Sequence, residues 1–187
     1  MQIQDLSAYT PQPGKALVLK SLKPNLTAHG GFQWPESGMI AAPDWSEYPV
    51  CGQGLHGWLW GAGDASLQVT GEDVKWLVLS VDADKVVELD GKVKFPDCEV
   101  IYCGSRETAV MIIAAYAPAG TKTMFVTMAV GSGSTVDAGD GSTVDAGDGS
   151  TVKAGYGSTV KAGYGSTVKA GDGSTVDAGD GSTVDAG

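Results

Sequence analysis

Gly133-Ser-Thr-Val-Asp-Ala-Gly-Asp140 is the first copy of an octapeptide that fills the sequence from residue 133 to residue 187. Seven copies of Gly-Ser-Thr-Val-(Asp/Lys)-Ala-Gly-(Asp/Tyr) follow one another without interruption, and the seventh lacks its last residue. A short, fixed period is typical of stacked structural units that contact only their neighbours. The sequence therefore predicts a repeat domain over residues 131–187.

Each copy predicts a short strand, Ser-Thr-Val-(Asp/Lys)-Ala, followed by a glycine-rich turn. Alternate side chains of a strand face opposite sides, so we expect Val and Ala inside and Thr and the variable charge outside. The pattern indicates an all-β parallel solenoid, also called a β-helix. Its predicted inner row is Ser134, Val136, Ala138, Val144, Val152, Val160, Val168, Val176 and Val184. Its predicted outward surface, the candidate for self-association, is Thr135, Asp137, Asp145, Lys153, Tyr156, Lys161, Tyr164, Lys169, Asp177 and Asp185.

The signs of the outward charges test how many octapeptides form one coil. If residues eight apart stack, two of six neighbouring pairs have opposite signs; at sixteen, four of five do, and at twenty-four all four do. Opposite charges on adjacent strands stabilise a sheet, and like charges oppose it. The charge pattern therefore allows sixteen or twenty-four residues per coil. We expect sixteen, because twenty-four residues per coil would leave barely two coils. Sixteen gives three and a half coils and places Tyr156 and Tyr164 on opposite edges, each between Asp residues.

Residues 1–130 hold all five Trp, all three Cys, both His and all eight Pro, which predicts a separate domain large enough to bury its own core. Strands are predicted at 16–19, 38–42, 74–81, 85–89, 92–95, 99–103 and 122–130. A helix capped by Ser105 is predicted at 106–116, and Asp90-Gly91 favours a hairpin turn. The predicted fold class is an α+β head dominated by antiparallel strands, followed by the solenoid. Trp45 and Tyr48 are expected to be exposed.

The glycine-rich segment from Cys51 to Gly63 holds the best candidate for a functional side chain, His56. A histidine in a packed turn is the interpretation we favour. Zinc is disfavoured because Cys98 and Cys103 lie five apart on a predicted strand, which directs them to opposite faces. We expect reduced thiols, no metal and no cofactor. No nucleophile or phosphate-binding motif is recognisable, so we predict that the chain is not an enzyme.

Three resemblances add to this interpretation. Cys51-Gly-Gln-Gly-Leu-His-Gly, Trp76-Leu-Val-Leu-Ser-Val and Val100-Ile-Tyr-Cys-Gly-Ser-Arg resemble an uncharacterised domain of phage and bacterial proteins, whose members often carry octapeptide-like repeats downstream. The Gly-Leu-His turn also faintly resembles ADP-ribosyltransferase folds, although no catalytic Glu can be matched. Ala154-Gly-Tyr-Gly-Ser-Thr-Val160 and its next copy resemble the bacterial ice-nucleation repeat, Gly-Tyr-Gly-Ser-Thr-x-Thr-Ala.

The resemblance to the ice-nucleation repeat implies two octapeptides per coil and an outward Thr-x-Thr pair that orders water. In this chain the second Thr is Asp or Lys in every copy, which weighs against ice binding. Calcium-binding solenoids are a further comparison, but they use a nine-residue period with Asp in each loop. Here the period is eight, and Tyr replaces the loop Asp twice. The near-identity of the copies fits a recently amplified or an engineered array.

The net charge of −10 without a basic patch argues against nucleic acid and anionic membranes as partners. Met1-Gln-Ile-Gln-Asp5 does not look like a signal peptide, so a cytoplasmic or virion-associated location is expected. The predicted function is structural: a charged solenoid tail, capped by the head, that mediates homo-oligomerisation with other copies of the chain. The alternatives are an ice-binding or ice-nucleation-like protein, and an ADP-ribosyltransferase-like enzymatic head on a multimerising stalk.

Overall fold

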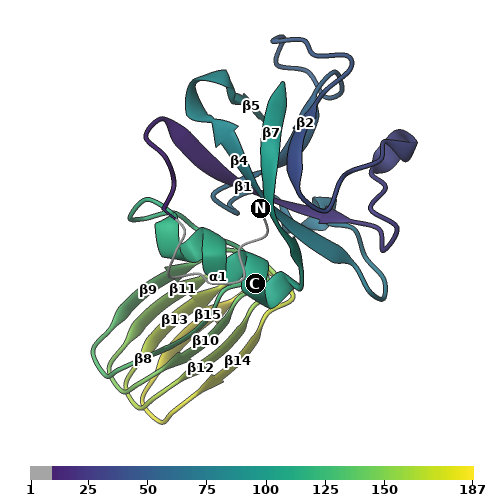
Figure 1. Cartoon of the computed structure of the whole chain (residues 1–187). Coiled ribbons are helices and arrows are strands. Elements are labelled where there is room, and N and C mark those ends of the chain that lie inside the picture. The colour runs from purple at the N-terminus through teal and green to yellow at the C-terminus, as the bar shows by residue number, and fades with distance from the viewer. Residues whose placement is uncertain (1–9) are drawn as a thin grey trace. The chain divides into compact units, whose positions relative to one another are not determined.

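The computed structural model describes residues 10–187 and divides the chain into two compact units, which meet between Pro118 and Ala119 (Figure 1). We call residues 10–118 the head and residues 119–187 the solenoid. The sequence placed the boundary after Val130. The two divisions differ because Thr127–Val130 forms a strand of the solenoid. The Met1–Asp5 segment, on which the localisation prediction rests, lies outside the described residues.

A seven-stranded antiparallel sheet forms the head. Its strands lie in the order β2 (Gly38–Ala41), β7 (Asp97–Gly104), β4 (Lys75–Asp82), β1 (Lys15–Leu22), β3 (Leu55–Leu59), β6 (Lys92–Phe95) and β5 (Val87–Leu89). Among residues 10–187, α1 (Arg106–Tyr116) is the only α-helix, and it packs on β1, β4 and β7. Short 3-10 turns cover His29–Gly31, Ala65–Leu67 and Ala83–Lys85. The head is thus mostly antiparallel sheet with one helix, and α+β describes it only loosely.

The local signals of the head explain its elements. The Ser105 hydroxyl accepts a hydrogen bond from the Thr108 N–H at 3.3 Å, so the predicted capped helix is confirmed. The buried face of α1 is Ala109, Val110, Ile112 and Ile113. The Asp90-Gly91 hairpin is confirmed as well, with Gly91 at a φ of 69° between β5 and β6.

A bulge in β7 changes which way its cysteines point. The pairing with β4 shifts register between Val78 and Leu79, because their partners Tyr102 and Val100 leave Ile101 as an extra residue. The bulge disturbs the alternation of side chains, and Cys98 and Cys103 both pack in the same core cluster. The expectation that they face opposite sides is therefore wrong, since it assumed a regular strand. Burial raises the pKa of the Cys98 thiol to about 12.

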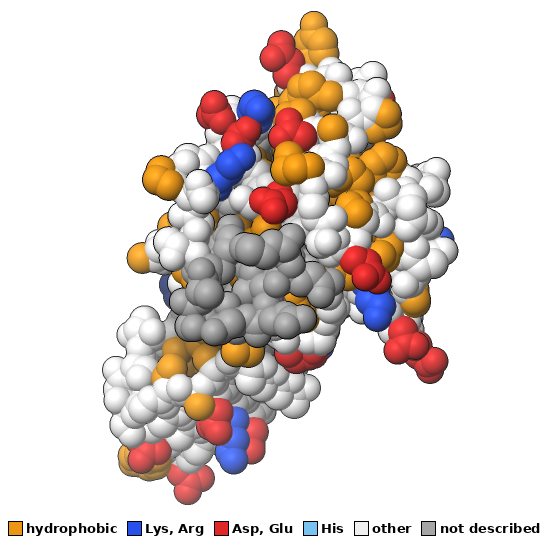
Figure 2. Space-filling model, viewed as in Figure 1, with side chains coloured by type: hydrophobic (Ala, Val, Ile, Leu, Met, Phe, Trp, Pro, Cys, Tyr) orange, Lys and Arg blue, Asp and Glu red, His pale blue; other side chains and the backbone are white. Residues whose placement is uncertain are grey.

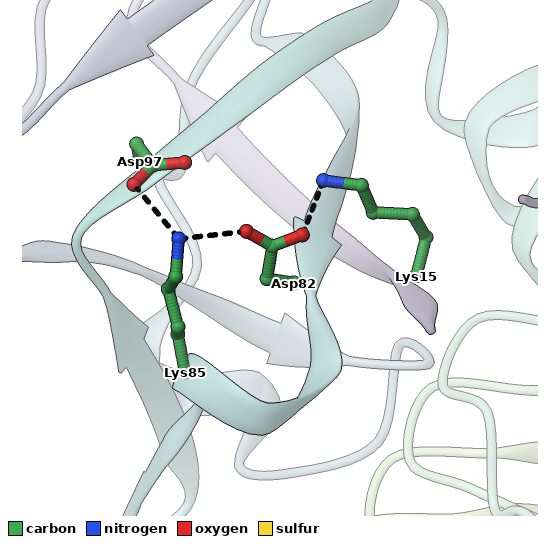
Figure 3. Close-up of polar contacts among 4 residues, drawn as sticks. All are labelled: Lys15, Asp82, Lys85 and Asp97. Carbon is green, nitrogen blue, oxygen red and sulfur yellow. Dashed lines mark hydrogen bonds and ion pairs between the residues drawn. The ribbon is translucent and has the colours of Figure 1, made fainter. Parts of the chain in front are cut away.

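An ion-pair network joins the ends of three strands of the head (Figure 3). Asp82, at the end of β4, contacts Lys15 at the start of β1 and lies 2.8 Å from the Lys85 ammonium. The Lys85 ammonium also lies 3.8 Å from Asp97 at the start of β7. Hydrogen bonds from Lys15 and Lys85 lower the pKa of Asp82 to about 2.

The solenoid consists of two four-stranded parallel sheets (Figure 1). One contains β8 (Thr127–Val130), β10 (Thr143–Ala146), β12 (Thr159–Ala162) and β14 (Thr175–Ala178). The other contains β9 (Thr135–Ala138), β11 (Thr151–Ala154), β13 (Thr167–Ala170) and β15 (Thr183–Ala186). Val144 pairs with Val160 and Val152 with Val168, so each coil has sixteen residues. The choice of sixteen over twenty-four, the other spacing that the charge pattern allowed, is confirmed.

The solenoid has four coils rather than three and a half. Its first strand, β8, pairs with β10 in the repeat register, with Thr127 opposite Thr143 and Met128 opposite Val144. Phe125 stands eight residues before Gly133 and has a φ of 61°, close to the 64° of Gly141. Residues 125–132 are therefore a divergent first octapeptide. The prediction of one strand over residues 122–130 in the head is wrong, because only residues 127–130 form a strand, and it belongs to the solenoid.

Each turn of the repeat needs its two glycines for different reasons. A Cβ on Gly155 would lie 2.1 Å from an Asp140 carboxylate oxygen and 2.7 Å from the Asp140 nitrogen, so the coils approach too closely for a side chain. Gly157 has open space but a φ of 64°, which disfavours other residues. Tight stacking and turn geometry therefore both depend on the Ala-Gly-x-Gly sequence.

A ladder of serines satisfies polar groups inside the coils. Ser142, Ser150, Ser158 and Ser166 are at most 1% exposed. The Ser158 N–H donates to the Ser174 hydroxyl one coil further on at 3.1 Å, and the Ser142 N–H donates to the Ser158 hydroxyl at 3.3 Å. Buried polar groups with partners do not carry the penalty of unpaired ones, which explains why a polar residue occupies the inner row.

Candidate functional sites

The predicted inner and outer rows of the solenoid separate cleanly in the middle coils. Val144, Val152, Val160 and Val168 are at most 1% exposed, whereas the variable charged residues are all exposed. Tyr156 and Tyr164 project to solvent with 62% and 66% exposure. Burial declines in the last coil, where Val176 is half-buried and Val184 is 46% exposed.

The outward charges form one column on each sheet. One column is Asp137, Lys153, Lys169 and Asp185, and the other is Asp145, Lys161 and Asp177, with the uncharged Ala129 in the first coil. Figure 2 shows red and blue side chains beside one another on the solenoid. The Lys169 ammonium lies 2.9 Å from the Asp185 carboxylate, and this hydrogen bond raises the pKa of Lys169. An exposed pair of this kind contributes little stability, because water screens the two charges.

Threonines form a second outward column on each sheet. Thr143 pairs with Thr127 and Thr159, and Thr151 pairs with Thr135 and Thr167. The threonines of the seven copies are exposed, and neighbours in a column are one strand spacing apart, about 4.8 Å. Each face of the solenoid therefore presents a single regular row of threonines beside a charged row.

The loop aspartates have a structural role. The Tyr156 N–H donates to an Asp140 carboxylate oxygen at 2.9 Å, and the Tyr164 N–H donates to Asp148 at the same distance. Each of these carboxylates thereby links one coil to the next. Among residues 10–187, no three His, Cys, Asp or Glu side chains gather as they would around a metal ion.

The head contains a cavity of about 570 Å³ beside β1 and β3. Its apolar wall includes Phe32, Trp34, Leu55, Trp58, Leu67 and Val69. Its polar groups include Lys20, Cys51, His56 and Lys92. The volume is within the range of small-molecule sites, roughly 300–1,000 Å³.

His56, the candidate from the sequence, lines this cavity. Its Nε2 accepts a weak hydrogen bond from the Gly52 N–H at 3.4 Å, which closes the glycine-rich turn. Burial lowers the pKa of His56 to about 4, and Lys92, Lys20 and Lys94 add to the shift. The ring is therefore neutral near pH 7, and its contact with Gly52 gives it a structural role.

Sequence reasoning missed three cationic or aromatic groups around His56. The Lys20 ammonium donates to the His56 carbonyl at 2.8 Å and lies 4.9 Å from the centre of the Trp34 ring. Lys92 lies 3.1 Å from the Cys51 sulfur. The available signal was Lys20 itself, because it stands in the otherwise apolar inward row Ala16, Val18 and Leu22.

A buried lysine was also missed. Lys94 is fully buried, donates to the Val50 carbonyl at 3.1 Å and lies 5.6 Å from the centre of the Trp45 ring. Trp45 is accordingly half-buried, and the prediction that it is exposed is wrong, since the 44–54 loop folds back over β6. Tyr48, in the same loop, is 72% exposed as expected.

The helices of the described chain offer no membrane span: none within residues 10–187 is both long and apolar enough to cross a bilayer.

Bacterial ice nucleation proteins are similar to this chain, which confirms the resemblance predicted from the repeat. An ice nucleation protein of Pseudomonas syringae pv. syringae is 37% identical over 117 residues, covering 60% of this chain and 10% of the relative. Ice nucleation protein InaU of Pantoea ananas is 36% identical over 101 residues, covering 53% of this chain and 10% of the relative. This chain thus spans only about a tenth of the length of these relatives.

No solved structure matches the chain. The names of the relatives are in keeping with the prediction that the chain is not an enzyme, which stays a prediction. Residues 16–112, just over half of the chain, match the family described as Domain of unknown function (DUF7666), and the chain therefore belongs to that family.

Proposed function

We propose that the solenoid is a self-association module through which copies of the chain assemble. The observation that supports this is the partly exposed inner row of the coil formed by β14 and β15. Val160 and Val168 in the preceding coil are 1% exposed, whereas Val184 is 46% exposed and Val176 is half-buried. Apolar residues of the inner row therefore face solvent in the 187-residue chain.

The backbone of the last coil favours the same proposal. In earlier coils each Ser carbonyl accepts from a Thr N–H of the next coil, as Ser158 does from Thr175 at 2.9 Å. Each turn glycine donates to the next coil too, as Gly165 does to Asp180 at 3.0 Å. β14 and β15 are the terminal strands of their sheets. Terminal strands offer such groups to another chain and promote edge-to-edge pairing.

The charge columns favour end-to-end association over one kind of lateral pairing. If two copies met antiparallel through the β9–β15 sheet, coil one would face coil four and coil two would face coil three. Asp137 would then oppose Asp185, and Lys153 would oppose Lys169. Like charges directly opposite one another are destabilising. End-to-end association can instead pair the β14 strands of two copies antiparallel, with Val176 opposite Val176 of the other copy. Asp177 then lies opposite Thr175, so no like charges face one another.

The proposal is tested by measuring the mass of the full chain with multi-angle light scattering over a range of concentrations. We expect masses above the 19.1 kDa of one chain. The double variant Val176→Lys/Val184→Lys places charges on the inner row of the last coil, and we expect it to be a monomer. The matched control, Thr175→Lys/Thr183→Lys, adds the same charges on the outward face and should still associate.

Hydrogen exchange of coils one to three must be unchanged in both variants, so that a change in mass reports the end surface alone. A wild-type chain that stays monomeric up to its solubility limit would overturn the proposal. Equal loss of assembly in both variants would overturn the assignment to the inner row.

Ice nucleation, or ordering of water on the threonine rows, is the second candidate. It is supported by the names of the relatives and by the exposed, in-register columns Thr143–Thr159 and Thr151–Thr167. The test is the freezing temperature of supercooled droplets that contain the chain. Replacing Asp137, Lys153, Lys169 and Asp185 by Thr completes a Thr-x-Thr surface and should raise the freezing temperature further. If droplets with the wild-type chain and droplets with the threonine variant both freeze at the temperature at which buffer alone freezes, this candidate is excluded.

A further inference from the structure

The cavity of the head collects positive charge in an acidic chain. The net charge is −10, yet Lys20 and Lys92 both line this one cavity, beside the neutral ring of His56, and Asp44 is the only acidic residue among its lining residues within the described chain. Clefts of one sign with low-dielectric walls concentrate counter-ions. The wall composition therefore indicates an anionic ligand.

Lys20 has an unusual position for a lysine. It lies on the core-facing side of β1, between Val18 and Leu22, both of which are fully buried. Within residues 10–187 no ion pair forms between Lys20 and a carboxylate; the ammonium meets the His56 carbonyl and the Trp34 ring. A charge in such a place costs free energy unless it is paired. Desolvation accordingly lowers the pKa of Lys20 to about 8, which leaves it mostly protonated at neutral pH.

Trp34 supplies a second, independent observation. It lines the cavity, it is 2% exposed, and its indole Nε1–H is buried without a hydrogen-bond acceptor among the described residues. Buried donors without partners are rare in folded proteins and call for an explanation. An acceptor atom of a ligand would satisfy this donor and would lie near Lys20, because the Lys20 ammonium is 4.9 Å from the Trp34 ring centre.

The rest of the wall suits a flat, apolar body. Phe32 packs edge-on against Trp34 with their ring centres 5.9 Å apart, and Trp58 stacks on Trp76. Leu55, Leu67 and Val69 extend this surface. Aromatic and aliphatic walls with a few convergent polar groups are typical of sites for small organic molecules.

We propose that this cavity binds a small organic anion with a planar ring. Its phosphate or carboxylate lies between Lys20 and Lys92, an acceptor atom meets the Trp34 indole N–H, and the ring packs against the aromatic wall. This site is separate from the solenoid and does not depend on its self-association.

The test uses the full chain labelled with nitrogen-15 at tryptophan, so that each of the five indole N–H groups gives its own NMR signal. The Trp34 signal is assigned with a Trp34→Phe variant. Adenosine monophosphate and benzoate are the two anionic probes, and adenosine, benzamide and inorganic phosphate are their counterparts without the charge or without the ring. We expect at least one anionic probe to move the Trp34 signal downfield and to bind at least about tenfold tighter than its counterparts.

Lys20→Met is the decisive variant, because Met suits the apolar row and should preserve the fold. We expect it to weaken binding of the anion at least about tenfold, whereas the exposed control Lys23→Met should leave binding unchanged. Binding of adenosine monophosphate but not benzoate would identify the ligand as a phosphate, and binding of benzoate but not adenosine monophosphate would identify it as a carboxylate. The proposal is overturned if neither anion moves the Trp34 signal, if the uncharged counterparts bind equally well, or if Lys20→Met binds like the wild type.

Discussion

One substitution, Val→Ala, placed at two equivalent positions of the repeat, tests the burial gradient of the solenoid. Val152 occupies the second coil and is fully buried, whereas Val184 occupies the last coil and is 46% exposed. The fourteen residues before each valine, 138–151 and 170–183, are identical, and the residue after it is Lys153 or Asp185, exposed in both cases. Any difference in the cost of the substitution therefore reports the stacking of the coils and not local propensity.

The expected magnitudes follow from the buried area. Val→Ala removes two methyl groups, each worth about 0.8 kcal/mol when fully buried, and leaves a cavity that adds to the cost. Val152→Ala should therefore destabilise the solenoid by about 2–3 kcal/mol. Val184 has about half of its side chain in water and encloses no cavity, so Val184→Ala should cost roughly 0.8 kcal/mol or less.

Hydrogen exchange read by mass spectrometry is the appropriate assay, because peptides from residues 119–187 report the solenoid alone. The tryptophans all lie before residue 119, so their fluorescence gives an independent control that the head is unchanged. Measurements belong at concentrations where the chain is monomeric. Equal costs at Val152 and Val184 under those conditions would refute the reasoning. A cost at Val184 that rises with protein concentration would instead show that another chain covers the last coil.

Two further predictions concern the turns and the pH dependence. Gly155→Ala should disrupt stacking of the second coil on the first, because its Cβ would lie 2.1 Å from an Asp140 oxygen. Gly157→Ala should cost only about 1 kcal/mol, because a Cβ there meets open space and only the positive φ is unfavourable. Equal urea unfolding midpoints for the two variants would contradict this prediction. The pKa of His56 is lower in the folded head than in the unfolded chain, so its contribution is complete above pH 6.5 and is lost as the pH falls toward 4. Because the ring is only half-buried, solvent screening keeps the loss well below the roughly 3 kcal/mol to which the full shift corresponds. Asp82 also has a lowered pKa, but its contribution disappears only below pH 3.8, as the pH falls through 2. Urea titrations of the head should therefore lose stability between pH 6.5 and 4 in the wild type and not in His56→Gln, and a slope unchanged by that variant would exclude His56 as the cause.

Periodicity carried most of the information about the solenoid. The alternation Thr-Val-(Asp/Lys)-Ala predicts which residues lie inside. The sign pattern of the variable charges argues against eight residues per coil, and the short length of the array favours sixteen over twenty-four. Both depend only on neighbours in a regular lattice, where one coil repeats the environment of the next. The divergent first octapeptide, residues 125–132, was not recognised in the sequence because only Thr127 and Gly131 keep the consensus. In addition, Phe125 stands where every other copy has a glycine with a positive φ.

The head shows the opposite balance. Its sequence alone determined most of the elements: the capped helix, the Asp90-Gly91 hairpin and the apolar strands each follow from local preferences. Tertiary structure alone decided the order of the seven strands, the bulge at Ile101 and the cavity, because they depend on contacts between residues far apart in the chain. Lys20 and Trp34 meet at one wall only through such contacts, so no local pattern pointed to the site. In the solenoid the physical environment repeats every sixteen residues, and for that reason the sequence alone predicted the coils that keep the exact repeat, while the divergent first octapeptide was found only in the tertiary structure.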